Sequence, residues 1–203
     1  MYLTVDQTQV RTGDRVEALS LARARAGASP NVDVWESAHS LRSGLVCLTA
    51  WWESLAALEV ASNGGALDGD PDQGPGAQSL LEPATQRLLT VVNGPTAFDQ
   101  THEYLRILEV SGLKDMQAAV DNAVELGAKM SNATGTSVTL LRNLTGFARD
   151  MMFVSTYASL AEYEAAGQHL QATSSWLHQR SQYGDVLDLS TLTMNLFRRL
   201  RLP

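Results

Sequence analysis

The sequence predicts an all-α protein: a helical bundle with a long coiled-coil-like helix or helical hairpin around residues 113–160. Apolar residues recur at three-to-four-residue spacing over long stretches, which is the pattern of an amphipathic helix. The chain has one clear break, at residues 63–76. Only 18 % of its 203 residues are charged, against about 25 % in typical globular domains. So few charges suit close helix–helix contact between subunits, and they suit a small Ala-rich helical domain equally well.

The N-terminal part is predicted to form an arm followed by helices. Residues 1–13 are polar and show no helical period, which indicates an N-terminal arm. Asp14 can cap a first helix, and Ser29-Pro30 can start a second that runs to about residue 62. Residues 14–62 are therefore predicted as the N-terminal helices. The apolar stripe of the second helix consists of Val34, Ala38, Leu41, Leu45, Leu48, Trp52, Leu55 and Leu58.

Residues 63–78 are predicted to form an acidic Gly/Pro loop. Its Asp68-Gly-Asp-Pro-Asp run is similar to the start of a calcium-binding loop. Such a loop needs a bidentate Glu at its twelfth position, and counting from Asp68 that position is Ser79. The composition therefore indicates a linker and no cation site.

Residues 79–203 are predicted to form a helical bundle and coiled-coil region. Capping boxes at 79–82 and 96–99 open two short helices, and a heptad-like seam runs from Leu113 to about residue 158. A break at Gly135 would turn that stretch into a hairpin. Further helices are expected to residue 183 and from 186 to the end, the last one apolar enough to require docking. The predicted interface residues are Leu113, Met116, Val120, Leu141, Leu144, Met151, Leu196 and Leu200.

Charge and composition argue against several classes of function. The net charge of −7 disfavours a nucleic-acid partner, because phosphate contacts need basic side chains. The single cysteine, Cys47, lies in an apolar run and permits neither an internal disulfide nor a cysteine-based zinc site. No stretch has the roughly 18 apolar residues of a membrane span. Without a general secretory signal pattern in the first residues, we expect synthesis in the cytoplasm, with any export by a specialised route.

The sequence contains little that predicts chemistry. Glu36-Ser-Ala-His39 has the Glu-x-x-His spacing of di-iron helical bundles, but no second such pair accompanies it. The remaining histidines are His102, His169 and His178. No nucleophile elbow, phosphate-binding loop or dinucleotide fingerprint occurs. We therefore predict no catalytic, cofactor-binding or metal-binding residues and no enzymatic activity, with a bundle enzyme built on Glu36 and His39 as the weakest alternative.

One stretch resembles a known family. The segments Gly112-Leu-Lys-Asp-Met-Gln-Ala-Ala-Val-Asp-Asn122, Lys129-Met-Ser-Asn-Ala133 and Leu140-Leu-Arg-Asn-Leu144 are similar to the C-terminal coiled-coil helix of type III secretion needle-tip and translocator-filament proteins. Met130 stands where that family has an aromatic residue. The resemblance implies an exported, self-assembling helical protein with itself and a cytoplasmic chaperone as partners. The alternative is a monomeric or dimeric helical adaptor or chaperone that binds one protein partner.

Overall fold

The predicted all-α fold is wrong, because the described part of the chain is dominated by antiparallel β-strands. The computed structural model describes residues 1–9, 20, 32–39, 45–63, 85–112, 115–145, 149–172 and 185–201. Within those ranges the chain forms eight strands and three helices. They belong to two compact units, unit 1 with residues 1–89 and 197–203, and unit 2 with residues 90–196.

Unit 1 is built around an antiparallel sheet with the strand order β4-β1-β3-β2. Its elements are β1 (Tyr2–Gln9), β2 (Val32–His39), β3 (Leu45–Trp52), α2 (Leu55–Asn63) and the first part of β4 (Thr85–Asn93). Strand β1 pairs with β3 so that Tyr2 lies opposite Trp52 and Thr4 lies opposite Ala50. The end of β8 belongs to this unit as well, and there the N–H of Leu200 donates to the Val34 carbonyl.

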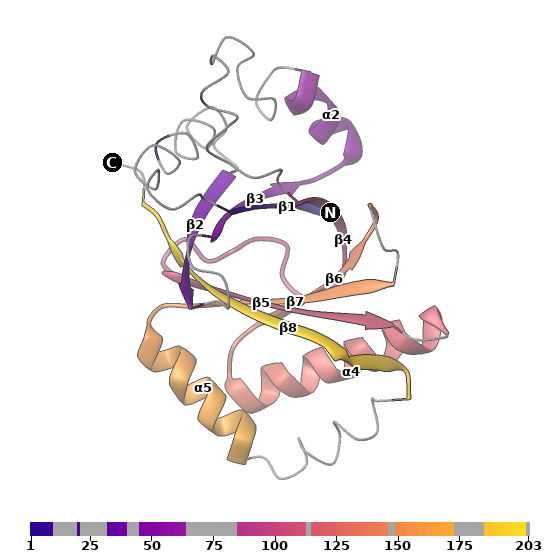
Figure 1. Ribbon diagram of the computed structural model, residues 1–203, viewed down its shortest axis with the longest axis vertical. Coiled ribbons are helices and arrows are strands. Elements are labelled where there is room, and N and C mark those ends of the chain that lie inside the picture. The colour runs from indigo at the N-terminus through magenta and orange to yellow at the C-terminus, as the bar shows by residue number, and fades with distance from the viewer. Residues whose placement is uncertain are drawn as a thin grey trace. The chain divides into compact units, whose positions relative to one another are not determined.

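Unit 2 repeats this arrangement with the strand order β8-β5-β7-β6. Its further elements are β5 (Tyr104–Gly112), α4 (Met116–Thr134), β6 (Val138–Asn143), β7 (Asp150–Tyr157), α5 (Leu160–Ala172) and β8 (Leu187–Arg199), the last up to residue 196. A helix thus follows the first and the third strand of a four-stranded sheet. This β-α-β-β-α-β order is that of a ferredoxin-like fold, and Figure 1 shows its elements with their labels.

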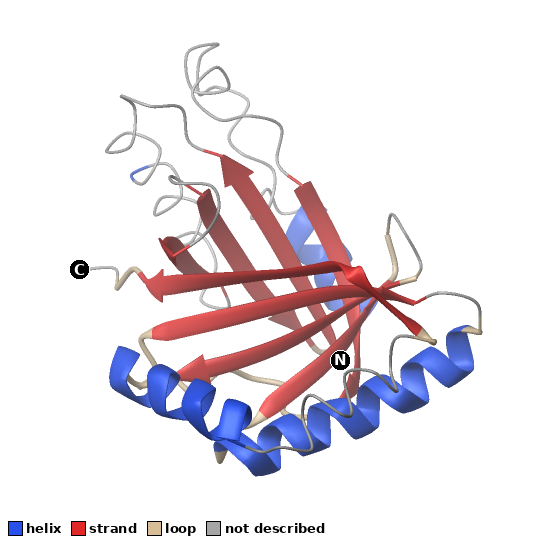
Figure 2. Cartoon of the chain, turned by 60° about the horizontal axis from the view of Figure 1, so that its bottom comes forward, coloured by secondary structure: helices blue, strands red, loops and turns tan. Residues whose placement is uncertain are grey.

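The helices of unit 2 cover one face of its sheet. Figure 2 shows α4 and α5 on the same side of the strands, where the two helices meet at an angle. Ala119, Ala123 and Leu126 of α4 pack there against Phe153 of β7 and Leu108 of β5, all of them buried. Because small alanines face the sheet, α4 can lie close to the strands.

The long predicted helix is only partly present. Asp115 caps α4, since its carboxylate accepts hydrogen bonds from the backbone N–H groups of Gln117 and Ala118. Gly135 ends the helix in the left-handed conformation, with φ of 68°, which glycine adopts without a steric cost. The break considered at Gly135 therefore exists, but strand β6 follows it in place of a second helical arm.

The other predicted helices meet three different outcomes. Residues 160–172 are helical as expected, and Leu55–Asn63 is the helical end of the predicted helix 29–62. Strands β2, β3, β4, β5 and β8 replace the remaining helices wherever the chain is described. The helix predicted from Asp14 lies, apart from Ser20, outside the described residues, as do residues 64–78 of the acidic loop.

The reason for these errors is burial on both faces of the strands. Strand β7 buries Met151 and Phe153 on one face and Met152 and Val154 on the other. Such a strand reads as a continuous apolar run, in which helical spacing is always satisfied by some of the residues. The apparent heptad seam therefore extended from a true helix into two strands.

The predicted interface residues are separated by this fold. Met116 and Val120 lie on α4, Leu141 on β6, Met151 on β7 and Leu196 on β8. Leu141, Met151 and Leu196 are buried, Leu144 is 46 % exposed in the turn after β6, and Leu113 lies outside the described residues. They are not the knobs of one coiled coil. Whether any of them, Leu200 included, contacts another protein stays a prediction.

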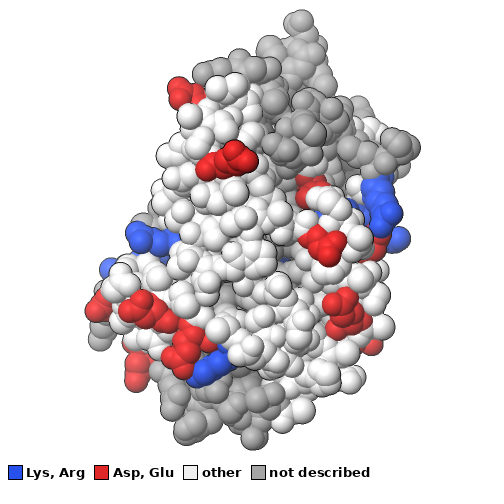
Figure 3. Space-filling model, turned by 180° about the vertical axis from the view of Figure 1, so that it is seen from behind, with Lys and Arg blue, Asp and Glu red and all other residues white. Residues whose placement is uncertain are grey.

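None of the described helices is both long and apolar enough to cross a membrane. On the face that Figure 3 shows, acidic and basic side chains alternate in small groups, and no broad basic surface forms there.

Candidate functional site

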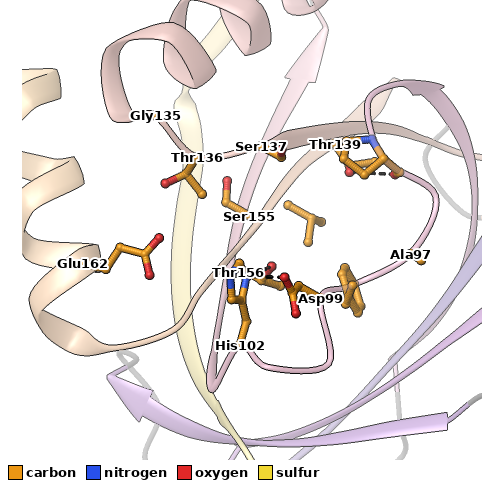
Figure 4. A pocket seen from close by; sticks show the side chains of 13 residues that line it. Ala97, Asp99, His102, Gly135, Thr136, Ser137, Thr139, Ser155, Thr156 and Glu162 are labelled. Atoms are coloured by element: carbon orange, nitrogen blue, oxygen red, sulfur yellow. Dashed lines mark hydrogen bonds and ion pairs between the residues drawn. The ribbon is translucent and has the colours of Figure 1, made fainter.

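The candidate site is a pocket in unit 2, at the end of its sheet where β7 stops and β5 and β6 start. Its cavity volume is about 510 Å³. Figure 4 shows the side chains that converge on it from strands β6 and β7, the loop before β5, the end of α4 and the start of α5. The residues that line it are Pro95, Ala97, Phe98, Asp99, His102, Gly135, Thr136, Ser137, Thr139, Val154, Ser155, Thr156 and Glu162.

The loop between β4 and β5 forms one wall of the pocket. Gly94 has φ of +102°, and a Cβ atom there would lie 2.4 Å from the carbonyl oxygen of Val138. Next to it, the Thr139 hydroxyl donates to the Pro95 carbonyl at 2.9 Å. Only glycine permits so close an approach of two backbones, and this approach places Phe98 and Asp99 at the pocket.

His102 is the titratable group at the centre of the site. Its Nδ1 lies 2.7 Å from the Thr156 hydroxyl, and its Nε2 lies 3.7 Å from Asp99 Oδ2. Asp99 itself shapes the turn, since its Oδ1 accepts hydrogen bonds from the backbone N–H and the hydroxyl of Thr101. The Thr156 hydroxyl and the Asp99 carboxylate thus orient one imidazole ring, which is what a proton-transferring histidine requires.

Glu162 contributes a carboxylate from α5, but much of its role is structural. Its Oε2 accepts a hydrogen bond from the Ala158 N–H at 2.7 Å, and the Glu162 N–H donates to the Ser159 hydroxyl. Together these two bonds cap the start of α5 in the manner of a capping box, with the Ala158 N–H in place of the N–H of the N-cap Ser159. The cap holds the carboxylate at the rim of the pocket, where Figure 4 shows it turned toward the other labelled side chains.

A buried cation lies behind Ser155. Arg106 is only 6 % exposed, and its Nη2 donates to the Ser155 hydroxyl at 3.1 Å. Its guanidinium carbon lies 5.7 Å from the centre of the Tyr157 ring, and Tyr157 makes an edge-to-face contact with Tyr163 of α5. Among the described residues no carboxylate pairs with this guanidinium, and its Nε has no hydrogen-bond acceptor.

The buried phenol of Tyr157 responds to the same surroundings. Burial raises the pKa of Tyr157 above its ordinary value of 10.0, and the charge of Arg106 opposes that shift most strongly. The Ser155 hydroxyl also lowers this pKa, although no hydrogen bond of acceptable geometry joins it to the Tyr157 hydroxyl. Tyr157 is therefore neutral, and it faces the cation with its ring.

None of the interface residues predicted from the sequence lines this pocket. The sequence predicts no role for His102, and it predicts that Asp99 lies at the start of a helix, where the structure has the turn before β5. Two signals could have located the site. Asp99-Gln-Thr-His102 matches a turn in which Asp bonds the residue two positions on, and Ser159-Leu-Ala-Glu162 is a capping box.

The segment that carries the Glu-x-x-His pair is a strand and not the predicted helix. Glu36 and His39 lie on strand β2, so this segment is not the helix that the Glu-x-x-His spacing of a di-iron bundle requires. Within the described ranges no group of three or more His, Cys, Asp or Glu side chains could hold a metal ion. Cys47 is buried on β3.

Comparison with known proteins gives a fold and no family. No family model matches the chain, and no curated protein matches it. Among solved structures, a candidate monooxygenase from Fusobacterium nucleatum has a TM-score of 0.71 at 11 % identity, covering 98 % of this chain and 92 % of that one. A candidate monooxygenase from Lactobacillus acidophilus has a TM-score of 0.67 at 13 % identity, covering 98 % and 93 %.

A third neighbour, an anthrone oxidase-like protein, has a TM-score of 0.70 at 12 % identity and covers 98 % of this chain and 92 % of its own. At such low identity these likenesses show the fold alone. That fold contradicts the resemblance to type III secretion proteins, because Leu140–Leu144 of the resembling segments lies on a strand and the turn after it. The predicted filament subunit, the helical adaptor and the expected absence of enzymatic activity lose their basis together with the helical bundle.

Proposed function

We propose that this chain is an oxidising enzyme of the monooxygenase type, and that its substrate binds in the pocket of unit 2. The observation that carries the proposal is the placement of His102, whose ring contacts the Thr156 hydroxyl at 2.7 Å inside a cavity of about 510 Å³. Support also comes from the neighbours of this fold, three of which bear names of oxygenase or oxidase type.

The proposed chemistry starts with a proton transfer to His102. Thr156 holds Nδ1, so Nε2 is the nitrogen that receives a proton from a bound carbon acid or hydroxyl. The imidazolium that results lies 3.7 Å from the Asp99 carboxylate, and an opposite charge at that distance stabilises it. The substrate becomes an electron-rich anion, which dioxygen can oxidise.

Anthrone, the compound in the name of one neighbour, suits a first test. Its methylene carbon loses two hydrogens and gains one oxygen atom, while the second oxygen atom leaves as water. The substrate supplies all the electrons, and dioxygen is the co-reactant. Oxygen uptake in an electrode cell and quinone absorbance measure the same reaction independently.

The variants for this test are His102→Asn and Thr156→Val, with His169→Asn as the matched control on the exposed side of α5. Loss of a general base is expected to slow oxidation by about 10²-fold or more. Loss of the Thr156 hydrogen bond is expected to slow it by about tenfold. Anthrone oxidation that is absent from the wild type, or that His102→Asn leaves unchanged, would contradict the proposal.

A further inference from the structure

The two units carry different side chains at one equivalent place. Tyr104 lies opposite Tyr157 in unit 2 as Tyr2 lies opposite Trp52 in unit 1, so Arg106 corresponds to Thr4. Both strand pairs join the first and third strands of a four-stranded sheet, in the orders β4-β1-β3-β2 and β8-β5-β7-β6. The polar groups that the two units carry at this position can therefore be compared directly.

In unit 1 this place is neutral and fully hydrogen-bonded. The Trp52 indole N–H donates to the Thr4 hydroxyl at 3.0 Å, and that hydroxyl donates to the Ala50 carbonyl at 3.3 Å. Ala50 is the counterpart of Ser155. The fold therefore needs no charge at this position.

In unit 2 the same place holds a buried cation with too few partners. Arg106 is 6 % exposed and Tyr157 is fully buried, and the Arg106 Nε and the Tyr157 hydroxyl both lack hydrogen-bond partners among the described residues. An unpaired buried charge costs folding free energy. A feature that costs stability and that the fold does not need points to a ligand.

Ser155 connects this cation to the pocket. Its hydroxyl accepts the hydrogen bond from Arg106 Nη2 and so keeps its own hydrogen for donation. Ser155 lines the cavity, and Figure 4 shows it between Thr136 and Thr156. A hydroxyl that a guanidinium polarises is a stronger donor than a free one. Its preferred acceptor is an anionic oxygen.

We infer that Arg106 is a positioning residue that acts through Ser155 to hold an anionic oxygen, of the phenolate or enolate kind, in the pocket of unit 2. This inference rests on the proposed function, because it describes the anion that proton transfer to His102 would leave on the substrate. Asp99 and Glu162 lie at the other sides of the pocket, where their carboxylates are engaged with Thr101 and Ala158. Arg106 supplies the positive charge that offsets them.

The probe for a test is 4-nitrophenol, whose absorbance separates the phenolate from the neutral phenol. It is titrated into the full-length protein below and above its own pKa, which yields an affinity for each form. In the wild type the phenolate is expected to bind more tightly. In Arg106→Met its affinity is expected to fall about tenfold, whereas the affinity of the neutral phenol changes by less than about twofold, because an opposite charge acts on the ionised form alone.

Four further variants separate the alternatives. Ser155→Ala keeps the charge but removes the connecting hydroxyl, so it is expected to lose the preference for phenolate as well, and Arg106→Lys is expected to restore part of it. Arg142→Met removes a cation from the exposed surface of β6 and should leave the preference unchanged. Ser137→Trp fills the pocket and should abolish binding of both forms.

Each negative result of these binding experiments contradicts a different proposal. A preference for phenolate that survives both Arg106→Met and Ser155→Ala overturns this inference and leaves the pocket and its histidine standing. Binding that survives Ser137→Trp, or that never saturates, overturns the pocket and the inference together. An Arg106-dependent preference in a protein that consumes no oxygen with anthrone would count against the oxidase activity only.

Discussion

Arg106 is a buried cation at a position where unit 1 has the neutral Thr4. Arg106 is 6 % exposed, and its guanidinium has Ser155 as its hydrogen-bond partner. A buried charge with so few partners lowers the stability of the fold, and the rest of the structure must offset that cost. For this single residue, the inferred role in ligand binding and the stability of the fold oppose each other.

Replacement of Arg106 by Met is expected to stabilise the protein. Met fills a similar volume with no charge to desolvate, so the free energy of unfolding should rise by about 1–3 kcal/mol. Urea unfolding measures it, and Arg142→Met on the exposed side of β6 should change it by less than about 0.5 kcal/mol. A loss of more than about 1 kcal/mol on Arg106→Met would show that the cation holds the fold together.

Asp33 of unit 1 links stability to pH. Its Oδ1 lies 3.7 Å from Arg199 Nε, yet burial raises the pKa of Asp33 above its ordinary value of 3.8 more than Arg199 lowers it. The folded state therefore holds this proton more firmly than the unfolded state. The stabilisation is complete below pH 3.8 and is lost as the pH rises through the raised pKa.

Asp33→Asn should remove this dependence. The free energy of unfolding of the variant, relative to the wild type, is expected to improve steadily as the pH rises from below 3.8 toward neutrality. Urea titrations across that range measure the difference. A difference that stays constant or falls with rising pH would contradict the expected direction.

At the scale of elements, two local contacts decide where chain segments start and stop. Asp115 accepts hydrogen bonds from two backbone N–H groups at the start of α4, at 2.9 and 3.2 Å. Asp115→Ala should lower the free energy of unfolding by about 0.5–2 kcal/mol. Asp121→Ala, which removes a side-chain contact with Gln117 on the same helix, serves as the control and should cost about 0.5 kcal/mol or less.

Gly94 controls the loop that walls the pocket. With φ of +102° and a would-be Cβ atom 2.4 Å from the Val138 oxygen, Gly94→Ala must displace the loop from β6. We expect a loss of about 2 kcal/mol or more in the free energy of unfolding, together with weaker binding of the phenol probe. Gly167→Ala on α5 has open space around it, and it should be neutral or slightly stabilising.

At the scale of the whole molecule, the division into units does not coincide with a linker. The boundaries fall at residues 89/90 and 196/197, inside β4 and inside β8. Two domains that unfold separately are usually joined by an exposed, flexible segment. Continuous strands across both boundaries favour joint unfolding.

We therefore expect one calorimetric transition for the chain. Leu140→Ala, at a buried site of unit 2, should cost about 2–5 kcal/mol and move that transition as a whole. Differential scanning calorimetry of the wild type and the variant measures it. Two transitions, of which the substitution shifts only one, would show that the units fold independently.

The sequence alone determined the positions where backbone chemistry is local. Gly135 stood out as a candidate break because glycine adopts the left-handed helix-ending conformation without a steric cost, and apolar spacing predicted helix over the residues of α5. The burial of Cys47 agrees with the apolar run in which this residue lies. These features need no knowledge of distant contacts.

Only the tertiary structure decided the fold class and the site. Segments such as Leu45–Trp52 and Asp150–Tyr157 are buried on both faces, so their apolar runs satisfy helical and extended patterns equally. Strand pairing, between residues such as Arg106 and Ser155 that lie 49 positions apart, resolves that ambiguity. The pocket gathers Asp99, His102 and Thr156 through the same long-range pairings, and periodicity along a chain carries no information about which distant segments will pair.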